Sequence, residues 1–303
     1  MKKRQIIILV IIILFVGLFI GIVFNTSKPN NKIKVVTTLF PFYDIAKNIG
    51  KDKVEVTLLL PPGVEAHSFE PSPSDIVKIK EADFFVYAGS TMQPWASDII
   101  NSITDNSTIV IDAFKGIKLI KNKIDNQQID PHFWLDFTNM IKVTDAFSKA
   151  IIIKDSSNKE YYTSNTSAYI TILNTLDKDF RKGLSRCKLS NIIYTGHSAF
   201  GYLERKYRLT FVNAYGAAPN AEASVQDMAS LVDQIKKDGA KYVFYEKILG
   251  PQLAQTLADE TSTNILPLNP GDNITKDEFN NNATFDSVMR SNLDNIKTGL
   301  ECQ

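Results

Sequence analysis

The chain has 303 residues, of which 44% are hydrophobic and 22% are charged, so it can bury a sizeable core in one or two domains. This composition excludes a disordered, collagen-like or disulfide-scaffold protein. The 34 basic and 33 acidic residues leave a net charge of +1, which provides no basic face for nucleic acid.

The first 32 residues predict attachment to a membrane. Three basic residues precede an apolar run, Ile6 to Phe24, which contains no polar side chain. A membrane-spanning helix needs about 20 residues, whereas the core of a signal peptide has about 7–15. We therefore expect residues 6–24 to be an N-terminal anchor in the cell membrane, with the following chain on the extracytoplasmic face; a cleaved signal peptide is the alternative. The polar residues 25–32 are typical of a tether.

From Ile33 onward, predicted strands and helices alternate, and we assign residues 33–156 to an N-terminal α/β lobe. Strands are predicted at residues 34–40, 54–60, 84–88 and 108–111, and helices at residues 42–49, 74–82 and 95–103.

A long helix is predicted to follow, at about 157–184 within a linking segment 157–186. No glycine or proline occurs in it before Gly183. Large apolar side chains recur there at helical spacing, at Tyr162, Tyr169, Leu173, Leu176 and Phe180.

The alternation then restarts in a C-terminal α/β lobe, residues 187–303. Strands are predicted at residues 191–194, 210–214, 242–246 and 265–269, and helices at residues 199–207, 225–237, 252–260 and 285–300. The predicted fold is therefore α/β: two Rossmann-like lobes with parallel sheets, bridged by one long helix. In such sheets ligands bind at the carboxyl ends of the strands, so the loops that follow strands are the candidate sites.

The sequence contains two cysteines, Cys187 and Cys302. A disulfide between them is chemically permitted outside the cell, and two unrelated thiols are the alternative.

The three histidines are the candidate metal ligands. His67, His132 and His197 each lie in a loop or at a strand-to-helix turn, and the chain has no other histidine. Neutral imidazole suits Zn²⁺ and other late transition metals. A closed tetrahedral site needs a fourth ligand, and Asp272 follows the last predicted strand where a carboxylate could supply it; the alternative is that Asp272 caps a turn.

Acidic residues near these loops are candidates to orient the imidazoles by hydrogen bonding. They are Glu65, Glu70, Asp136, Glu222 and Glu246.

Four segments together resemble the metal-specific solute-binding proteins of ABC importers, which deliver zinc or manganese across bacterial membranes. They are His67–Asp75 (HSFEPSPSD), Asp130–Asp136 (DPHFWLD), Gly196–Leu203 (GHSAFGYL) and Leu268–Asp272 (LNPGD). The resemblance extends from about Ile33 to Leu300. It implies two lobes bridged by a long helix, with His67 and His132 binding the metal from the first lobe and His197 and Asp272 from the second. A histidine as the third ligand in chain order, here His197, implies zinc rather than manganese.

The chain departs from the family pattern in four places. Glu65-Ala66 stands where many relatives have Asp-Pro, and Glu222-Ala223-Ser224 where Glu-Pro-Ser is common. Residues 121–128 contain no histidine, and no lipid-modified cysteine follows the apolar run.

The resemblance implies that the protein captures a divalent metal and passes it to a membrane permease, without chemistry. The sequence lacks a GxxxxGK[ST] phosphate loop, so the ATPase of the importer must be a separate chain. Three alternatives stay open: a manganese or iron carrier of the same family, a metal-dependent adhesin, and a zinc hydrolase with an open ligand position. Against the hydrolase, the sequence contains no HExxH helix.

Overall fold

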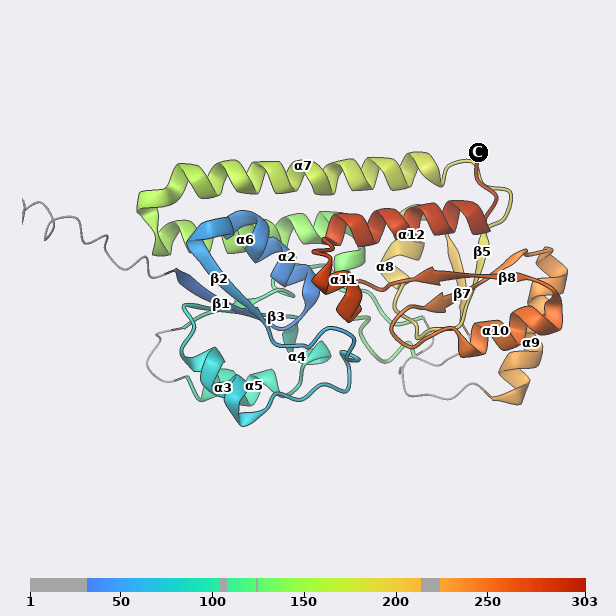
Figure 1. Cartoon of the computed structure of the whole chain (residues 1–303), viewed down its shortest axis with the longest axis horizontal. Coiled ribbons are helices and arrows are strands. Elements are labelled where there is room, and N and C mark those ends of the chain that lie inside the picture. Colours follow the sequence, from blue (N-terminus) through green and yellow to red (C-terminus); the bar gives the residue numbers. More distant parts are fainter. Residues whose placement is uncertain (1–31, 104–107, 124, 214–223) are drawn as a thin grey trace, which may run out of the picture. The chain divides into compact units, whose positions relative to one another are not determined.

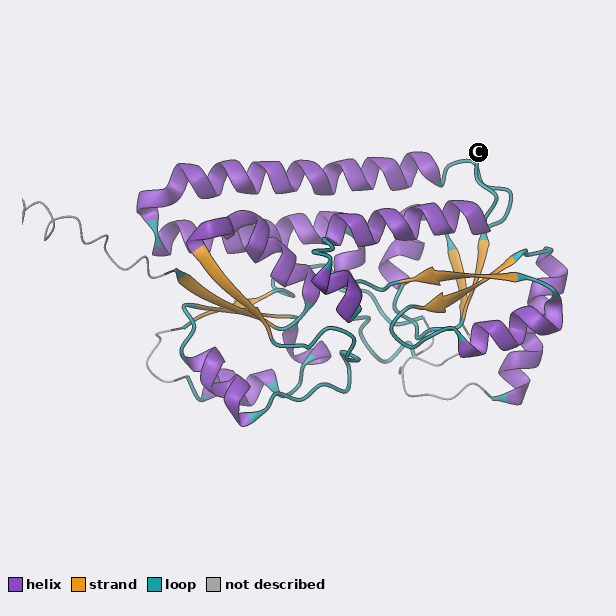
Figure 2. Ribbon diagram, viewed as in Figure 1, coloured by secondary structure: helices purple, strands orange, loops and turns teal. Residues whose placement is uncertain are grey.

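The computed structural model describes residues 32–103, 108–123, 125–213 and 224–303. Figures 1 and 2 show two groups of strands, each lying between helices. The predicted anchor, residues 6–24, lies outside the described residues. Among the helices that are described, none is both long enough and apolar enough to cross a membrane.

The first sheet has four parallel strands in the order β2-β1-β3-β4, and its strands are rich in Val, Ile and Phe. The strands are β1 (Ile33–Thr37), β2 (Val54–Leu58), β3 (Phe84–Tyr87) and β4 (Ile109–Asp112). The helices that follow them are α2 (Phe40–Gly50), α3 (Pro73–Lys80), α4 (Gly89–Met92) and α5 (Ala96–Asn101).

The second sheet repeats this topology, with the order β6-β5-β7-β8 and all strands parallel. Its strands are β5 (Asn191–Tyr194), β6 (Thr210–Asn213), β7 (Tyr242–Glu246) and β8 (Asn264–Leu268). Its helices are α8 (Gly201–Tyr207), α9 (Val225–Asp238), α10 (Gln252–Thr261), α11 (Lys276–Asn280) and α12 (Phe285–Gly299). Two doubly wound parallel sheets confirm the predicted fold class.

The predicted long helix is α7 (Lys159–Gly183), whose 25 residues span about 37 Å. It contacts α2, α6 (Phe137–Lys154) and α12, and runs along the latter two in Figure 1. Phe180 near its end packs on Phe137 and on Tyr207, so the buried side of α7 covers helices that belong to both sheets.

The helix α6 was not predicted, although it has 18 residues. Buried side chains recur along it at Met140, Val143, Phe147 and Ile151, a spacing of three to four residues. The run Ile151-Ile152-Ile153 at its end obscures this pattern, because β-branched residues favour strands. Packing on α7 and β4 overrides that preference.

One apolar core extends through the elements that face α7, from Val35 in β1 to Ile296 in α12. Smaller cores lie beneath the opposite helices: Ile79 of α3 and Ile99 of α5 cover the first sheet, and Leu231 of α9 and Leu257 of α10 cover the second. Residues 33–303 form one compact unit. The boundaries 33–156, 157–186 and 187–303 stay a prediction.

The structure contains a disulfide between Cys187, just before β5, and Cys302, at the end of the chain. The bond joins residues 115 positions apart in the sequence. It therefore ties the entrance of the second α/β segment to the residues that follow α12. In the chain-entropy description, closing so long a loop restricts the unfolded state strongly.

We expect the double variant Cys187→Ser, Cys302→Ser to lose roughly 2–5 kcal/mol of unfolding free energy, because its unfolded chain is no longer cross-linked. Urea denaturation followed by circular dichroism measures this. Dithiothreitol should lower the stability of the wild-type protein to that of the variant and leave the variant unchanged. Equal stability of both proteins without reductant would contradict the prediction.

Candidate metal centre

His67 lies in the loop that follows β2, and the carboxylate of Glu65 shapes this loop. Glu65 Oε1 accepts a hydrogen bond from the backbone N–H of His67 at 2.8 Å, and Oε2 accepts one from Ser68 at 2.8 Å. The loop ends at a capping box, in which Ser72 and Asp75 satisfy each other's backbone N–H groups at the start of α3. His67 is half-buried.

His132 stands at the start of the short 3₁₀ helix Phe133–Leu135 and is 1% exposed. The carboxylate of Asp130 accepts both the backbone N–H of His132, at 2.9 Å, and the ring Nδ1–H, at 2.8 Å. This fixes the tautomer, so the Nε2 lone pair is free. Nearby, Trp134 Nε1 donates to the carbonyl of Pro270 at 2.8 Å.

His197 follows β5 and is fully buried. Its Nδ1 donates to Glu246 Oε2, at the end of β7, over 2.8 Å, and its backbone N–H reaches the same oxygen at 3.2 Å. Tyr194 donates its hydroxyl to Glu246 as well, at 3.2 Å. A side chain at position 196 would collide with the ring of Tyr194, so only glycine permits this turn.

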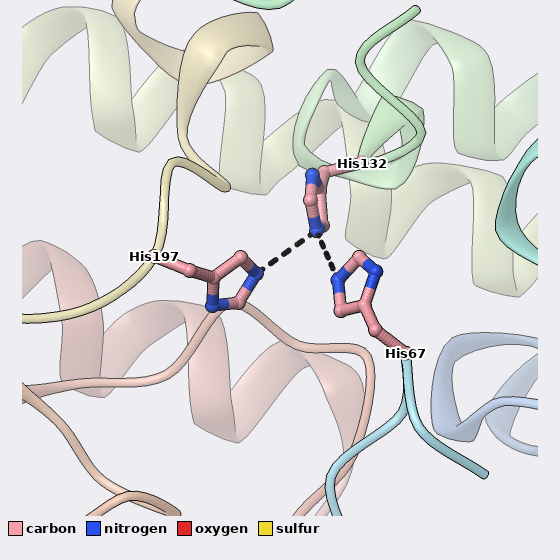
Figure 3. Close-up of side chains that lie close together, drawn as sticks. All are labelled: His67, His132 and His197. Atoms are coloured by element: carbon pink, nitrogen blue, oxygen red, sulfur yellow. Dashed lines mark hydrogen bonds between the residues drawn. The ribbon is translucent and has the colours of Figure 1, made fainter. Parts of the chain in front are cut away.

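The three imidazoles converge, as Figure 3 shows. His132 Nε2 lies 3.1 Å from Nε2 of His67 and 3.1 Å from Nε2 of His197. Three nitrogens bound tetrahedrally to one Zn²⁺ at 2.0–2.1 Å would be about 3.3 Å apart. Asp130 and Glu246 each accept a hydrogen bond from Nδ1, of His132 and His197, so Nε2 is the ring atom that each of these imidazoles presents to the gap.

Asp272 follows β8 and is 3% exposed. Its Oδ1 accepts the backbone N–H of Asn273 at 2.9 Å, which is the turn contact considered as the alternative role. Its other carboxylate oxygen has no hydrogen bond within the described residues. Ligand atoms of Glu65, His67 and Asp272 lie within 4.8 Å of one another, as do those of the three histidines.

The other acids that were predicted to orient the imidazoles lie away from the three histidines or outside the described residues. Asp136 caps α6 by accepting the N–H of Thr138 and pairs with Lys206, and Glu70 is exposed. Glu222 lies outside the described residues. Asp130, which contacts His132, was not among the predicted acids. Its signal in the sequence is an acid two residues before a candidate ligand, where the side chain can reach the following backbone N–H.

Burial sets the charge state of this centre. Burial and the neighbouring imidazoles lower the pKa of His67 to about 2, and burial also lowers the pKa of His132 well below its ordinary value. Burial opposes the charged form of His197, but the carboxylate of Glu246 outweighs it and raises the pKa of His197. Burial raises the pKa of Asp272 to about 7. Two of the three imidazoles are therefore neutral, as metal binding requires.

Comparison with known proteins identifies the family. The sequence model described as "Zinc-uptake complex component A periplasmic" matches residues 35–299. The chain belongs to this family. It is 34% identical over 288 residues to the high-affinity zinc uptake system protein ZnuA of Bacillus subtilis, with 91% of this chain and 90% of that protein covered.

Two groups of solved structures are similar to the chain. The Zn(II)-bound ZnuA-like domain of Streptococcus pneumoniae AdcA has a TM-score of 0.78 at 31% identity, with 89% of this chain and 100% of that chain covered. The chain spans only 58% of the AdcA chain in a second Zn(II)-bound structure. Lmb of Streptococcus agalactiae has a TM-score of 0.79 at 27% identity, with 89% of this chain and 100% of that chain covered. It is described as a bifunctional protein with adhesin and metal transporting activity.

We expect the metal-free His67→Gln variant to lose less stability in acid than the wild-type protein. Below the ordinary pKa of 6.5 the unfolded chain binds a proton on His67 that the folded chain excludes until about pH 2, so stability is lost as the pH falls. At about pH 5 this contribution reaches at most about 2 kcal/mol. Urea unfolding at pH 7 and pH 5 measures it, and equal pH dependence of both proteins would contradict it.

Proposed function

We propose that this protein captures a divalent metal ion, zinc, outside the cytoplasm and delivers it to the membrane permease of an ABC importer. The observation that carries the proposal is the convergence of three imidazole Nε2 atoms, two of them completely buried. We further propose His67, His132, His197 and Asp272 as the four protein ligands, with Asp272 approaching from the side of His67.

Zinc is supported by the donor set and by the relatives. Three imidazoles and one carboxylate suit Zn²⁺, whereas Mn²⁺ prefers sites richer in oxygen. The similar B. subtilis protein is named for zinc uptake, and the similar AdcA domain is Zn(II)-bound. Manganese and iron carriers remain the alternatives within the family.

Transport without catalysis is supported by the family, which serves zinc uptake. A hydrolytic zinc site keeps one ligand position for water, whereas here Asp272 is placed beside His67. A membrane permease and a separate ATPase complete the proposed importer, because this sequence has no phosphate-binding loop.

The proposed delivery needs only modest movement between lobes 33–156 and 187–303, which the segment 157–186 joins. Residues 270–274 of the second lobe are hydrogen-bonded to the first. The contacts are Trp134 to Pro270, Phe40 to Asp272, Gly63 to Ile274, and Asn273 to Pro61 and Val64. We infer that loops around the ion rearrange while the helix between the lobes stays in place.

Residues 6–24 are proposed as the anchor that keeps the protein at the extracytoplasmic face of the membrane. Their uninterrupted apolar character and the preceding basic residues support this.

Adhesion to a host surface is a second candidate function, which the similarity to Lmb supports. Lmb is described as combining adhesin and metal transporting activity. The two roles are therefore compatible on one fold of this kind.

The purified protein should contain one zinc per chain. Elemental analysis measures this, and titration with zinc against manganese should show the preference for zinc that three nitrogen ligands confer. A protein that binds manganese more tightly than zinc would overturn the assignment of the metal, and one that binds neither would overturn the proposed function.

Variants of the centre should weaken zinc binding in a defined order. Asp272→Ala removes a ligand, so its loss of affinity should exceed the roughly 10–100-fold expected for Glu246→Gln, which disturbs only the hydrogen bond behind His197. Glu70→Ala, an exposed acid beyond His67, is the matched control and should bind like the wild-type protein. Competition with a zinc-binding dye measures the zinc affinity of all three variants. Unchanged affinity of Asp272→Ala would remove Asp272 from the ligand set.

A further inference from the structure

We propose that Glu65, His67 and Asp272 form an outer metal position, which binds the incoming ion before it reaches the three histidines. The inference rests on the proposed function and deepens it, since it adds a step on the path to the same centre. Ligand atoms of these three residues lie within 4.8 Å of one another. The outer position shares His67 and Asp272 with the four ligands proposed above, and its inner neighbours are His132 and His197, so an ion can pass inward without losing all of its protein ligands.

The exposure of the side chains gives the order of the two positions. His132 is 1% exposed and His197 is 0% exposed, whereas His67 and Glu65 are half-buried. An ion arriving from solvent therefore meets Glu65 and His67 before it can contact His132 or His197.

The outer residues retain unused donor capacity. Each oxygen of Glu65 accepts one backbone N–H, from His67 or from Ser68, and an ionised carboxylate offers about four lone-pair sites. Asp272 is almost completely buried, yet only its Oδ1 is hydrogen-bonded within the described residues. A carboxylate with remaining acceptor capacity, beside an imidazole and a second carboxylate, is suited to a divalent cation.

Hydrogen bonds between loops hold the outer position in shape. Asn273 Nδ2 donates to the carbonyls of Pro61 and Val64, both at 2.8 Å, and the N–H of Gly63 donates to Ile274 at 2.8 Å. These bonds connect the residues adjacent to Asp272 with those adjacent to Glu65. The two carboxylates are therefore positioned before an ion arrives.

The two positions differ in their chemistry. Two carboxylates neutralise a divalent ion, which favours rapid capture from water. The inner set offers three imidazoles, and the carboxylates Asp130 and Glu246 behind two of them strengthen their nitrogens as donors. Capture at the outer position and retention at the inner one follow from these donor sets.

The first test measures zinc association and dissociation by stopped-flow fluorescence of Trp134, whose ring centroid lies 5.4 Å from that of His132. In the full chain, we expect Glu65→Gln to slow both association and dissociation at least threefold, because the ion enters and leaves through the same position. Glu70→Gln is the control and should match the wild-type rates. Faster dissociation with unchanged association would mean that Glu65 only orients the loop of His67, which would overturn the proposal.

The second test weakens the inner site by removing one of its ligands with His197→Ala, which leaves the outer residues intact. This variant should still bind one zinc weakly, and adding Glu65→Gln should weaken that binding at least tenfold further, whereas adding Glu70→Gln should not. His132→Ala serves in the same way if His197→Ala does not fold, as judged by circular dichroism. Residual binding that is independent of Glu65 would overturn the outer position while leaving the proposed function intact; a wild-type protein that binds no zinc would overturn both.

Discussion

The hydrogen bond from a buried imidazole Nδ1 to a buried carboxylate is the interaction on which the centre depends. Asp130 holds His132 in this way and Glu246 holds His197, each over 2.8 Å. Each bond places a proton on Nδ1 and turns Nε2 toward the centre, where the Nε2 atoms lie 3.1 Å apart. The folded protein therefore presents three imidazole nitrogens to one point, where a divalent cation can replace the protons that they share.

The protonation states of its side chains help to explain why the centre can be buried. An isolated charge in the interior is costly, so burial keeps His67 and His132 neutral and raises the pKa of Asp130 and Asp272 to about 7. A bound divalent ion supplies positive charge to these acids. Folding, protonation and metal binding are thus coupled at one place, which lies between segments far apart in the sequence.

The parallel sheets bring these segments together. The loops of His67 and Asp272 follow β2 and β8, and His197 follows β5 directly, so all three lie at carboxyl ends of strands. Hydrogen bonds from Trp134 and Asn273 then join the two halves of the centre. The α7 helix, packed on helices of both sheets, keeps the sheets in a defined relation while the loops carry the ligands.

The sequence by itself determined the alternation of strands and helices, the long helix and the three histidines as candidate metal ligands, because these depend on local periodicity and on donor chemistry. It left α6 unassigned, since the β-branched end of that helix obscures a pattern that only packing on α7 resolves. Only the tertiary structure decided which acids serve the centre: Asp130 rather than Asp136 behind His132, Glu246 behind His197, and Glu65 beside Asp272. Loop acids are common in any sequence, and which of them reaches an imidazole depends on how two sheets bring together residues as distant as Asn273 and Pro61.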